Sequence, residues 1–147
     1  MKSHLPKQLQ RIVEDFQSLQ TREEKYEELI AYGSRLDVFP EELRTAHNFV
    51  AGCTSDIYLS VCIDEGKVHF RGHADSLLVR GLIAILFEGC EGLPVDEFLS
   101  LRPDFVKTLG ITESLTASRA NTALTVFTTM QSRARMLAAK EKERKKK

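Results

Sequence analysis

The chain predicts an α+β domain in which helices come first, an antiparallel sheet follows and further helices complete the fold. Apolar residues near both ends recur at steps of three and four, which is typical of amphipathic helices. Apolar residues in the middle alternate with polar ones, which is typical of strands. With 147 residues, 42% of them hydrophobic and 29% charged, the chain is long enough for one domain with its own core. We expect that single domain to span residues 1–139.

Two helices are expected in the N-terminal region. Apolar residues recur every three or four positions over residues 5–19, with Pro6 in the first turn. Thr21 followed by Glu24 is a capping box and opens the second helix. Gly33 is suited to end that helix in the left-handed conformation.

The sheet is expected in the centre of the chain. Apolar and polar residues alternate over residues 57–63, a turn follows at residues 64–66 with Gly66 available for positive φ, and a second alternating run begins at Val68. Residues 47–50 are the candidate for a third short strand.

Two further helices are expected after the sheet. Asp75 is placed to cap an almost wholly apolar segment, residues 77–87, which Gly89 would close. A helix that is apolar on all sides is a buried one. The last helix begins near Ser118, and its expected inner stripe comprises Ala120, Leu124, Phe127, Met130, Ala134 and Leu137.

Charge is unevenly distributed along the chain. Basic and acidic side chains number twenty-one each, yet residues 140–147 carry a net charge of +4 and the residues before them −4. A mildly acidic body does not favour nucleic-acid binding, because such surfaces need clustered cations. We expect the basic tail over residues 140–147 to be solvated and disordered.

The cysteines and the apolar runs bear on the compartment. No signal-peptide segment precedes the body, and no stretch approaches the roughly 18 apolar residues that span a bilayer. Cys53, Cys62 and Cys90 form an odd set at irregular spacing, which is a poor disulfide framework. We therefore expect a cytoplasmic protein without membrane contact, in a reducing setting where free thiols persist and react.

Cys53 is the first candidate for chemistry. It follows Gly52 between two strand-like segments, and glycine removes the side-chain bulk that would block a partner sulfur. Reactivity also needs a thiolate, which local amide groups or a nearby cation favour. Taken alone, this position leaves a functional and a buried structural cysteine both open. Cys62 and Cys90 have no activating neighbour in the sequence, so structural roles are favoured for them.

A metal or iron–sulfur scaffold that uses Cys53, Cys62 and Cys90 is the alternative. The chain has no Cys-x-x-Cys pair and no regular Cys/His spacing of the zinc-finger type. His47, His73 or Asp75 would complete a ligand set only if the fold brought them together with the cysteines.

Arg119 and Asp75 are the remaining charged candidates. Arg119 lies in the first turn of the last helix, where the helix dipole makes a cation mildly unfavourable. We infer that Arg119 reaches an anion elsewhere, such as a carboxylate or a sulfur anion. Capping explains Asp75, with a functional role as the second possibility.

Three ordered motifs resemble those of the SufE family of sulfur-acceptor proteins. Residues 50–55, Val-Ala-Gly-Cys-Thr-Ser, are similar to the family's segment around its persulfide-carrying cysteine. Residues 72–75, Gly-His-Ala-Asp, lead into residues 78–82, Leu-Val-Arg-Gly-Leu, and resemble its second motif. Residues 115–121, Leu-Thr-Ala-Ser-Arg-Ala-Asn, resemble its third.

The resemblance implies a fold shared with IscU-type scaffolds, with a three-stranded antiparallel sheet packed by N-terminal and C-terminal helices. It implies that Cys53 accepts sulfur from a pyridoxal-phosphate cysteine desulfurase of the SufS type and passes it to an iron–sulfur scaffold. The protein would then be an activator and transfer partner rather than an enzyme in its own right, with no cofactor of its own, as a monomer or homodimer. Asp75 and Arg119 would belong to the surface around Cys53.

Overall fold

The structure, a computed structural model, describes residues 5–51, 56–105 and 117–146, so Cys53 lies outside the described residues. The elements are α1 (Lys7–Gln17), α2 (Arg22–Gly33), η1 (Glu41–Leu43), η2 (Ala46–Asn48), β1 (Ile57–Asp64), β2 (Lys67–Ala74), α3 (Leu77–Cys90), α4 (Val95–Ser100) and α6 (Ala117–Lys146). The α+β class and the order of helices, sheet and helices are therefore confirmed.

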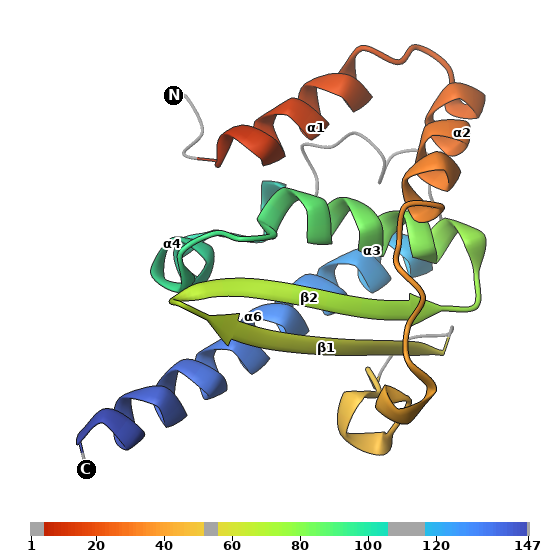
Figure 1. The fold of residues 1–147 in the computed structure, drawn as a ribbon. Helices are drawn as coiled ribbons and strands as arrows, with labels where there is room; N and C mark the ends of the chain where they lie inside the picture. The colour runs from red at the N-terminus through yellow and green to blue at the C-terminus, as the bar shows by residue number, and fades with distance from the viewer. Residues whose placement is uncertain (1–4, 52–55, 106–116, 147) are drawn as a thin grey trace.

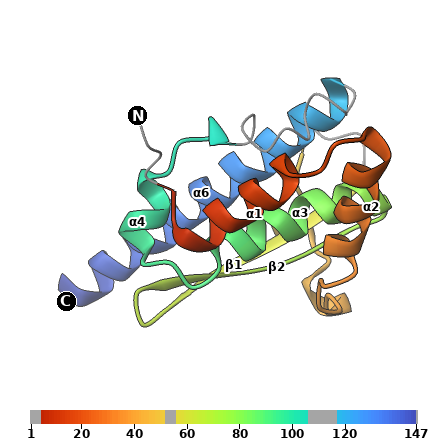
Figure 2. The same cartoon turned by 90° about the horizontal axis from the view of Figure 1, so that it is seen from above.

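Helix α3 is the centre of the molecule. The hairpin of β1 and β2 lies on one side of α3, and α1 and α2 lie on the other (Figure 1). Helix α6 runs beside α3 over the same face of the hairpin, where it contacts β1 (Figure 2). Residues 79 and 81–87 of α3 are all buried, which confirms the prediction of a buried apolar helix.

The sheet has two strands over the described residues, and the expected third strand is not shown. Residues 46–48 form the short helix η2 instead, which leaves an isolated antiparallel bridge between Phe49 and Tyr58. The hairpin turn is confirmed: Glu65 and Gly66 have φ values of 52° and 78°, as a two-residue turn of the type I′ class requires.

The predicted roles of two helix-terminal glycines are wrong. Helix α2 ends at Gly33, and its C-cap Ser34 is right-handed with φ −70°, so Gly33 does not supply a left-handed cap. Helix α3 continues past Gly89 to Cys90, and the positive φ of 78° falls on Gly92. A Cβ on Gly89 would lie 2.5 Å from Leu9 Cδ1 of α1, so the Leu9 side chain would have to shift if residue 89 carried one.

The buried face of helix α6 is rotated slightly about the helix axis from the predicted one. Phe127, Met130 and Ala134 face the core as expected, but Leu124 is 39% exposed and Ala123 is buried in its place. The helix continues through Lys146, so residues 140–146 are its last turns, which project beyond the hairpin (Figure 1). No helix within the described residues is long and apolar enough to cross a membrane.

The basic end of α6 should be dispensable for stability. The side chains of residues 142–145 are exposed, and changes away from packed features usually alter the free energy of unfolding by less than about 0.5 kcal/mol. Thermal melts of a chain ending at Ala139 should match those of the full chain. A chain ending at Thr129 is the control, because it also loses the buried Met130 and Ala134. A clear drop in melting temperature for the chain ending at Ala139 would contradict the prediction.

Candidate functional site

The described residues on either side of Cys53 lie next to each other in the fold. The backbone N–H of Val50 donates to the carbonyl of Ile57 at 2.9 Å, next to the Phe49–Tyr58 bridge. The two stems of the Cys53 turn, which we define as residues 48–50 and 57–59, are therefore held side by side. Val50 and Ile57 are 2% and 0% exposed, so both stems are anchored in the core.

Aromatic rings surround these stems on the outer face of the sheet. The Phe49 ring meets the Tyr58 ring edge-on with centroids 5.5 Å apart, and Phe39 stacks on Tyr58 at 6.4 Å. Phe49 is nevertheless 38% exposed. The stems thus present an accessible apolar surface next to the turn.

Asp75 lies at the same end of the sheet, because its neighbour Ala74 pairs with Ile57. Its carboxylate Oδ1 is 3.3 Å from Nε2 of His73, and the Arg44 guanidinium is also 3.3 Å from that nitrogen. Asp75 does not cap α3, which corrects the prediction. Ser76 is the N-cap, and its hydroxyl accepts from the backbone N–H of Val79 at 3.4 Å. The Asp75 side chain therefore has no capping role, and it is 69% exposed.

Both histidines of β2 contact residues from other parts of the chain. The side chain of His73 is only 17% exposed beside Asp75 and Arg44. The His69 ring contacts the carboxylate of Glu91 through Nδ1. Residues from outside β2, Arg44 and Glu91, therefore partly cover these two rings.

Arg119 falls within the first turn of α6, as expected. The helix begins at Ala117, so Ser118 is inside it rather than before it. The side chain of Arg119 lies outside the described residues, and the anion that it was expected to reach is not tested.

The other two cysteines differ strongly in environment. Cys90 is fully buried, and this burial raises the pKa of its thiol to about 12, so it remains a neutral thiol at physiological pH. Cys62 is exposed on the outer face of β1, where it pairs with His69. Within residues 5–51, 56–105 and 117–146, no group of three or more His, Cys, Asp or Glu side chains could hold a metal ion.

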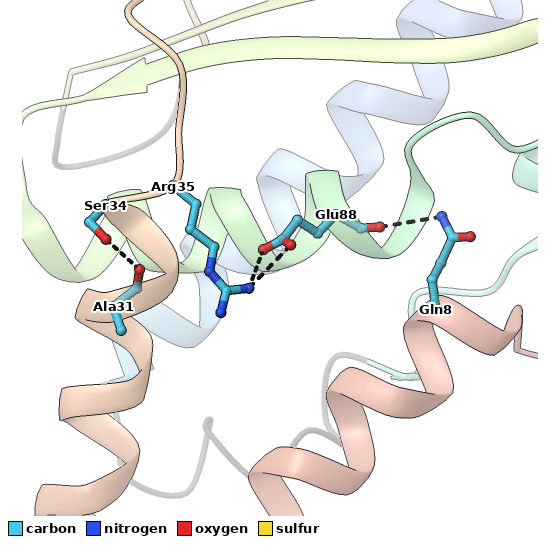
Figure 3. Close-up of polar contacts among 5 residues, drawn as sticks. All are labelled: Gln8, Ala31, Ser34, Arg35 and Glu88. Atoms are coloured by element: carbon cyan, nitrogen blue, oxygen red, sulfur yellow. Dashed lines mark hydrogen bonds and ion pairs between the residues drawn. The ribbon is translucent and has the colours of Figure 1, made fainter.

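A pocket of about 470 Å³ lies along the other edge of β2, between residues 35–38 and α3. Its wall includes Arg35, whose Nη1 lies 3.2 and 3.3 Å from the two carboxylate oxygens of Glu88 (Figure 3). Gln8 of α1 donates to the main-chain carbonyls of Glu88 and Glu91 at 3.3 and 2.9 Å. These contacts join α1 and the segment that follows α2 to α3. The pocket lining includes neither stem of the turn nor Asp75.

Arg133 is the residue near the turn that the sequence pattern did not single out. Its guanidinium donates to the carbonyls of Asn48, Phe49 and Leu59, which belong to both stems. One feature of the sequence could have identified Arg133: it is a cation three residues after Met130, beside the buried apolar stripe of α6.

Comparison with known proteins defines the class of this α+β domain. The family model named SufE, Fe-S metabolism associated domain, matches residues 10–134. The cysteine desulfuration protein SufE of Wigglesworthia glossinidia brevipalpis is 36% identical over 88% of this chain and 92% of its own length. The chain belongs to the SufE family.

Other relatives agree with this assignment. An uncharacterized SufE-like protein of Synechocystis is 42% identical, covering 88% of this chain and 82% of the relative. The sulfur acceptor protein CsdE of Escherichia coli is 36% identical over 71% of this chain and 73% of its own. The solution structure of a hypothetical protein from Thermus thermophilus, at 23% identity, superimposes with a TM-score of 0.80 over 92% of this chain and 98% of that one, which shows the shared fold.

Proposed function

We propose that this protein accepts sulfur on Cys53 from a pyridoxal-phosphate cysteine desulfurase and passes it to an iron–sulfur scaffold. Membership of the SufE family carries the proposal, because family relatives are named cysteine desulfuration and sulfur acceptor proteins. The geometry supports Cys53 as the acceptor, because the stems on either side of it are fixed to one another.

The proposed chemistry is a thiol–disulfide type of exchange. The Cys53 thiolate attacks the outer sulfur of the desulfurase persulfide, so that a new S–S bond forms on Cys53. The S–S bond of the desulfurase breaks at the same time, and its cysteine leaves as a thiolate. No net oxidation occurs, and the pyridoxal phosphate remains in the partner.

The scaffold alternative receives no support from the described residues. It would require Cys90, whose thiol is fully buried and whose pKa is raised to about 12. A metal ligand must be deprotonated, and burial in apolar surroundings opposes that step. The sulfur acceptor role is therefore the better hypothesis.

Intact-mass spectrometry tests the proposed function. The purified chain is incubated with a cysteine desulfurase and cysteine, and it should gain about 32 Da for each sulfur atom carried. The adduct should disappear on treatment with a reductant, because persulfides are reducible. A chain that stays unmodified while the desulfurase itself becomes persulfidated would contradict the proposal.

Arg119 and Asp75 are proposed to flank Cys53 and shape the desulfurase interface. The exposed Asp75 carboxylate lies at the end of the sheet from which the turn leaves, which supports its part. Arg119 is proposed to favour the thiolate or persulfide anion electrostatically.

The Arg119→Ala variant should fold normally but take up sulfur about fivefold more slowly, since a nearby charge in a solvated site is worth about 1 kcal/mol. Loss of the cation should also raise the pKa of the Cys53 thiol, which the pH dependence of Cys53 alkylation reports. Arg135→Ala, at an exposed site of the same helix, is the matched control. Normal uptake with an unchanged alkylation profile would reduce Arg119 to a structural residue.

A further inference from the structure

Arg133 of α6 binds the main chain on both sides of the Cys53 turn. Its Nη1 donates to the carbonyl of Asn48 at 3.3 Å and also to that of Leu59, and its Nη2 donates to the carbonyl of Phe49 at 3.0 Å. Asn48 and Phe49 enter the turn, whereas Leu59 follows it. One guanidinium therefore bridges the two stems.

The environment of Arg133 is unusual for a surface helix. Partial burial lowers the pKa of Arg133, and no ion pair joins it to a carboxylate of the described residues. A cation that is withdrawn from water and left without a carboxylate is costly unless its donors are satisfied. Here the carbonyl oxygens of the stems supply that compensation, through charge-assisted bonds.

These three hydrogen bonds also depend on the planar shape of the guanidinium group. The guanidinium presents its donors in a rigid planar fork, so it can reach carbonyls of two different chain segments at once. A lysine ammonium is a compact point charge and does not reproduce that geometry. The same side chain ties α6 both to β1 and to the stem that precedes it.

We propose that Arg133 is a positioning residue that holds the two stems of the Cys53 turn in register for sulfur uptake. The predicted effect of Arg133 on sulfur uptake rests on the proposed function, whereas its predicted effect on the structure of the two stems does not. The Phe49–Tyr58 bridge and the Val50–Ile57 hydrogen bond join the stems to each other, and Arg133 adds a polar link from both stems to α6.

The test compares Arg133→Met, which removes the charge and the donors, with Arg133→Lys, which keeps the charge and the ammonium donors but loses the planar fork. Arg135→Met, at an exposed site two residues along the same helix, is the matched control. Hydrogen exchange of the Val50 amide reports the stems directly. It should become about tenfold faster in both Arg133 variants and stay unchanged in the control, as expected for loss of charge-assisted hydrogen bonds.

Kinetics separate positioning from mere stability. In the folded variants, the rate of sulfur uptake at saturating desulfurase should fall about tenfold, while the desulfurase concentration that gives half the maximal rate should not change. Unchanged Val50 exchange and unchanged uptake in either folded variant would overturn the proposal. A wild-type chain that takes up no sulfur would overturn the proposed function instead, and the Val50 exchange would still decide the role of Arg133.

Discussion

The Cys53→Ser variant is expected to gain no sulfur from a cysteine desulfurase, whereas the wild-type chain gains about 32 Da per sulfur atom. A serine hydroxyl cannot form the S–S bond that holds the transferred atom, so the loss should be complete rather than partial. The stems that flank residue 53 are fixed by their own contacts, and the thermal stability of the variant should be unchanged. Intact-mass spectrometry before and after reduction measures the effect.

Two cysteine variants serve as controls because their environments differ. Cys62→Ser removes an exposed thiol, and Cys90→Ala removes a buried one. Both should load sulfur like the wild-type chain. The adduct on Cys62 or Cys90, with Cys53 intact and empty, would show that the assignment is wrong. Cys90 should in addition resist alkylation up to high pH, because burial raises the pKa of its thiol to about 12.

Local signals in the sequence predicted local structure well. The Thr21–Glu24 capping box is present, with Glu24 N–H donating to the Thr21 hydroxyl at 3.0 Å. The Gly66 turn is also present, because both features depend on residues a few positions apart. The buried character of α3 was equally readable, since it follows from composition alone.

Features decided by tertiary contacts were not readable in this way. Gly33 reads as a helix end, but it packs tightly against α3, since a Cβ there would lie 3.0 Å from the Gly81 nitrogen. Asp75 and Ser76 are both good N-caps by residue type, and nothing in their order shows which one the chain uses. Arg133 donates to carbonyls 74 to 85 residues away, a pairing that no helical periodicity encodes.

The second motif that resembles the SufE family has a structural explanation at Gly81. A Cβ at this position would lie 2.1 Å from the Leu29 carbonyl oxygen and 2.7 Å from its carbon. These are backbone atoms of α2, which cannot rotate away as a flexible side chain would. The glycine is therefore required by the contact between α2 and α3, and no chemical role is needed to account for it.

Gly81→Ala should accordingly destabilise the fold strongly, by about 3 kcal/mol and with a melting temperature about 10 °C lower. The sign is informative, because replacing glycine by alanine inside a helix normally stabilises it by about 0.5–1 kcal/mol. Gly92→Ala is the control: its φ of 78° is strained for alanine, but nothing lies within 4 Å of the added Cβ, so a loss of only about 1 kcal/mol is expected. Equal melting temperatures for Gly81→Ala and the wild-type chain would show that α2 and α3 can move apart enough to accommodate a methyl group without loss of stability, and the close contact at Gly81 would then not be required by the fold.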